Sequence, residues 1–384
     1  MSARVMETPI MSSMTRAQRM FAAMRFQPVD RVPYSTYNCH PYGRNEHTDD
    51  PSYGRILENV RARAGATTKL GLRGGLGLGL TRVRPGLVET LTKEYGEGRL
   101  IRTVIHTPKG DLESVTKAPE HQPSMTIKPL FTTDEDMDKY MSVPYEPPEF
   151  DATPLREFIQ SAAGRAVPFV QYDEPMSEVG RNLEMEGFSI RCLTDLPSVK
   201  RMIDWAYERC EDSLRRMVSA CKGIECVFLC SGPERCTPPM LAPHFYAELV
   251  LPYHKKLNRI IRDGGLLVGL HCHGRLRDVF PYIVESGVQV LEPVEPPDQG
   301  DIALAELMRQ ARGKTCLMGY IQDQELYTAS PGHMTRKVEE IARVVDGGTG
   351  YIMCSTCTPF AHPCPETYER NYLEWLDAGE KFLA

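Results

Sequence analysis

The stretch LLVGLHCHGRLRDVFPYIVESGVQVLEPVE, residues 266–295, decides the fold class of this chain. Two short apolar runs, LLVGLHCHG and VQVLEPVE, flank a segment with helix-like character. Further apolar runs of the same kind are VPFVQYDE, CVFLCSG, TCLMGYI and GYIMCST, and helix-like segments separate them. This alternation indicates parallel strands joined by crossover helices.

Strands that are apolar on both faces suit a sheet that helices cover on both sides. Two architectures fit, an open doubly wound sheet and a closed eight-stranded barrel. No glycine-rich phosphate loop follows a first strand, as a dinucleotide-binding sheet would require. We therefore expect an α/β protein with a (β/α)8 TIM barrel, elaborated within a single domain that spans residues 1–384.

The first part of the chain has a different pattern. TRAQRMFAAMRF predicts an N-terminal helix with Thr15 as its N-cap, and DRVPYSTY predicts the first barrel strand. Residues 88–115 alternate apolar and polar side chains around YGEGR and PKGD, which predicts a β-hairpin insertion. The proline-rich residues 143–154 predict an extended linker. We assign no function to the glycine-rich residues 71–83, because they lack the lysine of a nucleotide loop.

Charge and hydropathy exclude several classes of partner. The net charge of −6 comes from interspersed residues, so it predicts no nucleic-acid or anionic-membrane surface. No window approaches the length of an apolar membrane span, and the N-terminus lacks the apolar core of a signal peptide. We expect a cytoplasmic protein whose 12 cysteines are reduced, and whose partner is a small molecule or another protein.

Several strand ends carry side chains that can bind a metal. In a strand, His271 and His273 point to one face and Cys272 to the other, so two imidazoles can reach one ion. The next three runs end in Glu292 and Glu295, in Gln322 and Asp323, and in Cys354 and Cys357. Functional groups of a TIM barrel collect at the C-terminal ends of its strands. Nitrogen, oxygen and sulfur donors at one rim predict a zinc site with an exchangeable position.

The alternative is that each of these residues has an ordinary structural role. A single histidine at a strand end is more often bonded to nearby backbone than to a metal. Four consecutive strand ends with metal-binding side chains reverse that preference.

The chain also resembles a known superfamily. The segments that carry the resemblance are TRAQRMFAAMRFQPVDRVPY, LAPHFYAELVLPYHKKL, HCHGRLRDVFPYIVESGVQVLEPVEPPDQGDIALAEL, CLMGYIQDQEL and GGTGYIMCSTCTPF. Together they are similar to the uroporphyrinogen decarboxylase superfamily over most of the chain. The superfamily is built on the (β/α)8 barrel and contains decarboxylases, zinc-dependent corrinoid methyltransferases that act with thiols and, more distantly, cobalamin-independent methionine synthases. Its branches differ in chemistry, so the site has to decide between them.

The site pattern is nearest to the zinc-dependent methyltransferases. The resemblance implies a metal bound by His271, His273, Glu295 and Cys357, with His273 standing where that branch has a cysteine. The exchange of a thiolate for an imidazole makes the site less electron-rich. Cys354, three residues before Cys357, is the alternative sulfur ligand.

The decarboxylase branch fits less well. A decarboxylase for a multiply carboxylated porphyrinogen needs arginines near its substrate, which the family provides after the first strand. Here the corresponding segment offers only Arg44 and Arg55, among acidic residues.

The resemblance thus implies a zinc-dependent methyltransferase that moves a methyl group between a corrinoid, such as methylcobamide on a separate carrier protein, and a thiol. Metal coordination would supply the thiolate nucleophile at neutral pH. Glu292, Asp323 and Glu234 are the candidate catalytic residues, and Asp173 and Glu174 end another strand near them. Two competitors remain open: zinc that polarises a carbonyl or activates water, and a catalytically silent barrel that binds a tetrapyrrole or corrinoid.

Overall fold

The computed structural model describes residues 14–383 apart from 75–80, 83–84, 97, 120–123, 346 and 348. Most of the glycine-rich segment 71–83 therefore lies outside the described residues. No helix in the described part of the chain is both long enough and apolar enough to cross a membrane.

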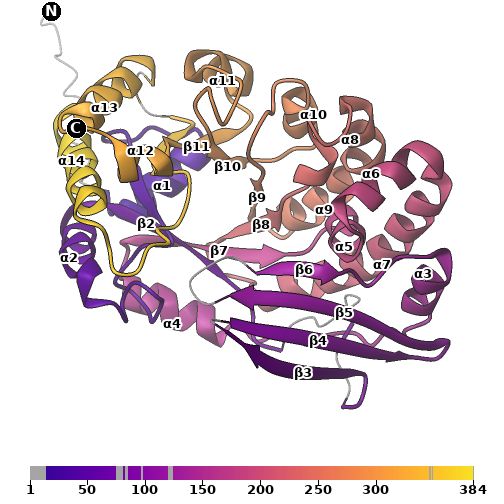
Figure 1. Ribbon diagram of the computed structural model, residues 1–384. Helices are drawn as coiled ribbons and strands as arrows, with labels where there is room; N and C mark the ends of the chain where they lie inside the picture. Colours follow the sequence, from indigo (N-terminus) through magenta and orange to yellow (C-terminus); the bar gives the residue numbers. More distant parts are fainter. Residues whose placement is uncertain are drawn as a thin grey trace, which may run out of the picture.

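Eight parallel strands close into a barrel, as expected (Figure 1). In barrel order they are β1 (Tyr34–Tyr37), β12 (Tyr351–Ser355), β11 (Cys316–Ile321), β10 (Val290–Val294), β9 (Leu267–His271), β8 (Val227–Ser231), β7 (Ala166–Tyr172) and β2 (Gly65–Leu70), which pairs again with β1. The six apolar runs of the C-terminal part all form barrel strands. Their continuous burial reflects a sheet that is covered on both faces.

Helices surround the barrel and supply the outer layer of the core. They are α2 (Gly54–Arg63), α4 (Thr153–Ala162), α5 (Pro175–Asn182), α6 (Met185–Thr194), α7 (Leu196–Ala220), α8 (Pro243–Leu249), α9 (Leu251–Asp263), α10 (Phe280–Glu285), α11 (Leu304–Ala311), α12 (Asp323–Thr328), α13 (His333–Val344) and α14 (Glu366–Phe382). In α7, for example, Val199, Met202 and Ile203 are buried together. Their spacing of three and four residues is that of one helix face.

The N-terminal helix α1 (Arg16–Met24) begins where the sequence predicts. Thr15 accepts a hydrogen bond from the backbone N–H of Gln18, and the Gln18 side chain accepts one from the backbone N–H of Thr15. This reciprocal capping box satisfies two N–H groups that the first helical turn leaves free. The predicted N-cap is confirmed.

The insertion is an antiparallel sheet that projects beside the barrel (Figure 1). It contains β3 (Val88–Tyr95), β4 (Gly98–Thr107), β5 (Gly110–Pro119) and a fourth strand, β6 (Met125–Lys128), beyond the predicted range. Helix α3 (Asp134–Met141) follows it. Residues 144–150 then run without helix or strand to α4, over most of the predicted linker.

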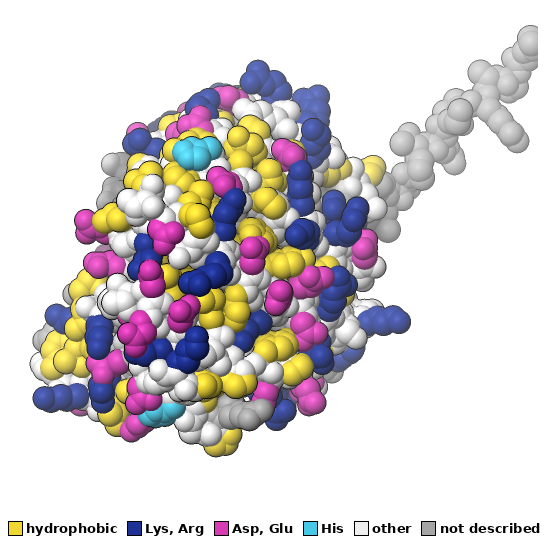
Figure 2. Space-filling model, turned by 90° about the vertical axis from the view of Figure 1, so that its right-hand side faces the viewer, with side chains coloured by type: hydrophobic (Ala, Val, Ile, Leu, Met, Phe, Trp, Pro, Cys, Tyr) yellow, Lys and Arg dark blue, Asp and Glu magenta, His cyan; other side chains and the backbone are white. Residues whose placement is uncertain are grey.

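The surface carries charges of both signs. On the face in Figure 2, lysine and arginine side chains are interspersed with aspartate and glutamate. That face therefore has no single-sign patch that would attract nucleic acid.

Candidate metal centre

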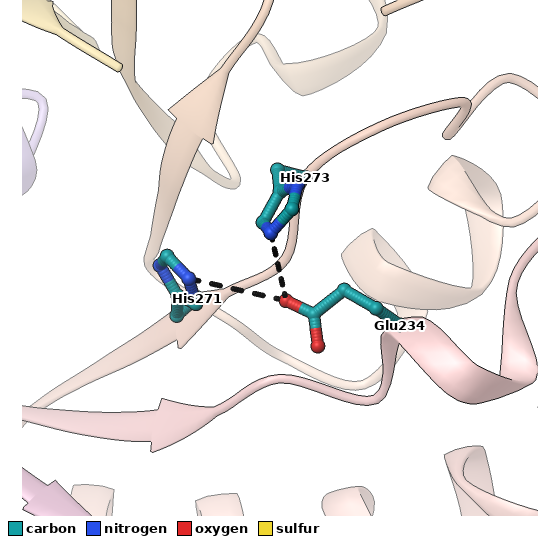
Figure 3. Close-up of side chains that lie close together, drawn as sticks. All are labelled: Glu234, His271 and His273. Atoms are coloured by element: carbon teal, nitrogen blue, oxygen red, sulfur yellow. Dashed lines mark ion pairs between the residues drawn. The ribbon is translucent and has the colours of Figure 1, made fainter. Parts of the chain in front are cut away.

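Three potential metal ligands meet at the C-terminal end of the barrel. His271 is the last residue of β9, His273 follows in the next loop, and Glu234 begins the short turn η3 (Glu234–Cys236) after β8. Figure 3 shows both imidazole rings turned toward the Glu234 carboxylate. Functional sites of TIM barrels occupy this face.

The ligand atoms are close enough to share one ion. Glu234 Oε1 lies 4.0 Å from His271 Nε2 and 3.9 Å from His273 Nε2. All three atoms lie within 4.8 Å of one another, and they form the one such group found among the described residues. Two imidazole nitrogens and one carboxylate oxygen are a donor set that zinc accepts.

One carboxylate oxygen of Glu234 is free to bind a ligand. Its Oε1 is buried and has no hydrogen-bond partner among the described residues. Gly232, two residues earlier, leaves the necessary room: a Cβ there would collide with the carbonyl oxygen of His271 and with both Glu234 carboxylate oxygens. A buried oxygen with unused lone pairs is costly unless a ligand engages it.

Each histidine has a second carboxylate behind it. His271 Nδ1 lies 3.0 Å from Glu292 Oε1, and Glu292 is fully buried in the middle of β10. His273 Nδ1 lies 3.8 Å from Glu295 Oε2, which accepts a hydrogen bond of 2.8 Å from the backbone N–H of Gly274. A carboxylate within hydrogen-bond distance, as Glu292 is, fixes the tautomer and orientation of a ligating imidazole, whereas Glu295 is too far from His273 for a hydrogen bond.

The environment of Glu292 favours its ionised form. Burial by itself would raise the pKa of this carboxyl group, but the neighbouring His271, Lys69 and Tyr37 outweigh burial and lower it. Tyr37 is the last residue of β1 and Lys69 the last but one of β2, on the other side of the barrel interior. Burial, together with Glu292, raises the pKa of the Tyr37 hydroxyl, which therefore stays protonated and able to donate.

The residues that lie together in the structure differ from the ligand set that the family resemblance implies. His271 and His273 come together, but their third neighbour is Glu234 rather than Glu295, which stands behind His273. Cys357 lies outside the group of mutually close ligand atoms, and the residue as a whole is exposed although its sulfur is partly covered. Burial of its sulfur and the nearby Asp323 raise the pKa of the Cys357 thiol. Cys354 is buried inside β12. Zinc bound by His271, His273, Glu295 and Cys357 remains a prediction.

The other acidic candidates have structural partners. Tyr368 donates a 3.0 Å hydrogen bond to Asp323 Oδ1, and burial raises the pKa of Asp323 to about 6. Glu174 caps α5 by accepting from the backbone N–H groups of Met176 and Ser177. Asp173 pairs with Arg181 at 2.5 Å.

Two residues near the site were missed from the sequence. Strand β2, with the polar sequence GATTKL, has no apolar run, so Lys69 did not enter the candidate list. The number of strands could have located β2. The predicted first strand and the six apolar runs make seven strands, so an eight-stranded barrel needs one more between the first strand and VPFVQYDE. Tyr37 lies in the predicted first strand, where the sequence pattern indicates no functional role for it.

A large cavity lies elsewhere and is not part of this site. It measures about 690 Å³ and is lined by residues of α1, α4 and the start of β7, at the opposite end of the barrel. Metal-binding side chains are not among its lining residues apart from Glu225, which pairs with Arg25.

Comparison with known proteins identifies the family. A model described as uroporphyrinogen decarboxylase (URO-D) matches residues 176–371, just over half of the chain. This chain belongs to the uroporphyrinogen decarboxylase family. The matched region includes Glu234, His271, His273 and the carboxylates behind them, whereas Tyr37 and Lys69 precede it.

The fold of this uroporphyrinogen decarboxylase family member is similar to that of solved structures with low sequence identity. It is similar to a methyltransferase from Methanosarcina mazei, with a TM-score of 0.57 and 13% identity over 96% of this chain and 99% of that chain. A B12-independent methionine synthase from Shewanella sp. W3-18-1 has a TM-score of 0.43 and 11% identity over 73% of each chain. No curated protein matches the sequence.

Proposed function

We propose that this family member is a zinc-dependent methyltransferase that moves a methyl group between a corrinoid or another methyl donor and a thiol acceptor. The observation that carries the proposal is the convergence of two imidazole Nε2 atoms on the buried Oε1 of Glu234, which has no hydrogen-bond partner among the described residues. Membership of the uroporphyrinogen decarboxylase family and the structural likeness to a methyltransferase support it.

The residues present fit a zinc ion. Catalytic zinc sites use three protein ligands and leave a further position open for substrate. Glu234, His271 and His273 supply three donors, and their one negative charge leaves a bound Zn²⁺ with a net positive charge that an anionic thiolate neutralises. When bound, zinc supplies a Lewis acid that lowers the pKa of a coordinated thiol.

The surrounding residues prepare this arrangement. In the Nδ1–H tautomer, His271 donates from Nδ1 to Glu292, and the Nε2 lone pair of the ring faces Glu234. Glu295, anchored by the backbone of Gly274, limits the rotation of His273. Asp323 follows β11 and is buried, with Tyr368 as its hydrogen-bond donor.

The methyl donor of this proposal is a methylated corrinoid on a separate carrier protein. The cluster lies at the C-terminal end of the barrel, at the ends of β8 and β9. The side chain of His273 is 51% exposed, so a partner docked on the rim can reach the site.

A second candidate function follows from the absence of sulfur in the cluster. Zinc held by two histidines and one glutamate is the donor set of metal-dependent peptidases, in which the metal activates water. Hydrolysis or lyase chemistry is therefore the alternative that the geometry favours next, and requirement for a thiol separates the two.

Porphyrinogen decarboxylation receives less support from the structure. Arg44 pairs with Asp49 at 2.9 Å and Arg55 with Glu369 at 2.9 Å, and both arginines are exposed. Two neutralised surface arginines do not form a pocket for a polycarboxylate.

The proposal is tested with free methylcobalamin and 2-mercaptoethanol as probes. In the expected reaction the thiolate forms an S–C bond, and the Co–C bond breaks with its electron pair remaining on cobalt as Co(I). We expect methyl thioether formation by zinc-loaded protein, and loss of it in His271→Ala. Thioether formation that is equal in His271→Ala, or absent from the zinc-loaded native protein while a hydrolytic activity is present, would contradict it.

A further inference from the structure

Lys69 lies directly behind the proposed metal ligand His271. Its Nζ is 3.2 Å from His271 Nδ1, 3.6 Å from Glu292 Oε1 and 4.8 Å from the centre of the Tyr37 ring. Only 18% of the lysine side chain is exposed. The cation therefore sits inside the barrel mouth, on the far side of the imidazole from Glu234.

The backbone holds Lys69 at this position. Its N–H donates a 2.9 Å hydrogen bond to Asn38 Oδ1, and β2 pairs with β7 so that Lys69 lies opposite Phe169. Because the backbone of Lys69 is fixed on the barrel wall, its side chain reaches only groups at the barrel mouth.

Two hydrogen-bond arrangements are available at His271 Nδ1, and they have opposite consequences. A neutral imidazole has one N–H and one nitrogen that accepts or binds a metal. When Nδ1 donates to Glu292, the Nε2 lone pair faces Glu234 and can bind a metal. When Nδ1 instead accepts, from the Lys69 ammonium at 3.2 Å or the Tyr37 hydroxyl at 3.4 Å, Nε2 carries the proton and cannot bind a metal.

We propose that Lys69 is a positioning residue for the metal centre: its ammonium engages Glu292 and the Tyr37 ring, so that His271 donates from Nδ1 to Glu292 and presents Nε2 to the metal. The inference rests on the metal site of the proposed function but not on methyl transfer.

The buried carboxylate gives Lys69 its preferred partner. Within the described part of the chain, the ion pairs of Glu292 are with Lys69 and His271, and its Oε2 has no hydrogen-bond partner there. An ammonium has three donors and no acceptor, so it is attracted to the carboxylate more strongly than to a neutral ring nitrogen. The aromatic face of Tyr37 holds the same ammonium from another side.

The chain contains a matched control for this lysine. Lys337, on α13, is 15% exposed, and its Nζ lies 3.1 Å from Glu325 Oε1 and 5.7 Å from the Tyr320 ring centre. His333 Nε2 lies 3.3 Å from the same Glu325 oxygen. This lysine, glutamate and histidine repeat the chemistry of the Lys69 group away from the proposed ligands.

The experiment compares Lys69→Met, Lys69→Arg and Lys337→Met with the native protein. Zinc affinity is measured by competition with a chromophoric chelator, and the tautomer of His271 is read from nitrogen NMR of metal-free, ¹⁵N-histidine-labelled protein. We expect Lys69→Met to weaken zinc binding about tenfold and to shift His271 from the Nδ1–H form toward a mixture of tautomers. Lys69→Arg should recover affinity to within about threefold of native, and Lys337→Met should leave both measurements unchanged.

Zinc affinity of Lys69→Met within about twofold of native, with the His271 tautomer unchanged, would overturn the inference. If Lys69→Met does not fold, Lys69→Gln removes the same charge with a polar side chain and is judged by the same two measurements. Neither measurement depends on turnover. A protein that shows the expected Lys69 effects but transfers no methyl group would overturn the proposed reaction and leave the role of Lys69 supported.

Discussion

The two sides of the barrel mouth both carry metal-binding residue types, but they use them differently. At the ends of β8 and β9, Glu234 Oε1 has no hydrogen-bond partner among the described residues, and two imidazole nitrogens face it. At the ends of β11 and β12, Asp323 accepts from Tyr368, and the Asp323 N–H donates to Thr356 Oγ1 at 3.2 Å. Both sides have metal-binding residue types. What distinguishes the proposed metal site is a carboxylate oxygen without a hydrogen-bond partner among the described residues, whereas the Asp323 carboxylate is already hydrogen-bonded within the protein.

The largest expected loss of zinc affinity comes from a substitution at the ends of β8 and β9. Glu234→Gln removes the anionic oxygen and keeps the side-chain shape, so we expect zinc affinity to fall by more than about 100-fold, beyond the cost of losing a residue that only supports a ligand. Chelator competition measures it. Asp173→Asn is the matched control, because Asp173 ends a neighbouring strand but pairs with Arg181. Equal zinc affinity in Glu234→Gln and native protein would remove Glu234 from the site.

A smaller loss is expected from the carboxylate behind His271. Glu292→Gln keeps the volume but weakens the charge-assisted hydrogen bond to Nδ1, so zinc affinity should fall by roughly 10–100-fold. Glu295→Gln should cost less than about tenfold, since the 3.8 Å separation from His273 is too long for a hydrogen bond. The same titration ranks the two variants, and the reverse order would show that Glu295, not Glu292, is the closer support of the metal.

The substitution Cys357→Ser, at a residue that follows β12 on the other side of the barrel mouth, tests whether this side contributes a zinc ligand. Because the thiol lies outside the cluster of close ligand atoms, the substitution should change zinc affinity by less than about threefold. A loss as large as that of Glu234→Gln would instead make Cys357 a ligand, as the family resemblance implies.

The smallest effect on zinc affinity is expected from substitution of Asp323. This substitution should instead change the free energy of unfolding. The pKa of Asp323 is about 6 in the folded protein against an ordinary 3.8, so the folded state holds this proton more tightly than the unfolded state. Folding therefore loses up to about 3 kcal/mol from this group as pH rises from 3.8 to 6 and beyond. Asp323→Asn should lack that loss and be the more stable protein at pH 7.5, with zinc affinity unchanged.

Urea unfolding of native protein and Asp323→Asn at pH 4.5 and pH 7.5 measures the difference. A stability difference between the two proteins that is the same at both pH values would contradict the raised pKa.

The barrel strands were largely predictable because their signals are local. Apolar runs located β7 to β12, and a Thr15 cap located α1. Strand β2 escaped because GATTKL is polar, and its place is set by closure of the barrel rather than by its own composition.

The candidate site was predictable only in part. The i, i+2 spacing correctly brought His271 and His273 to one place, with Cys272 buried on the other side. The position of Glu234 depends on its close packing against Gly232 and on the pairing of β8 with β9, which sequence spacing does not encode. For the same reason, the distance between a loop cysteine such as Cys357 and the strand ends could not be predicted.

The most direct test of this account is zinc K-edge X-ray absorption of the zinc-loaded native protein. The account predicts a shell of nitrogen and oxygen neighbours at about 2.0–2.1 Å, with outer scattering from two imidazoles and without sulfur. A zinc–sulfur distance of about 2.3 Å in protein free of added thiol would contradict it and place a cysteine among the ligands.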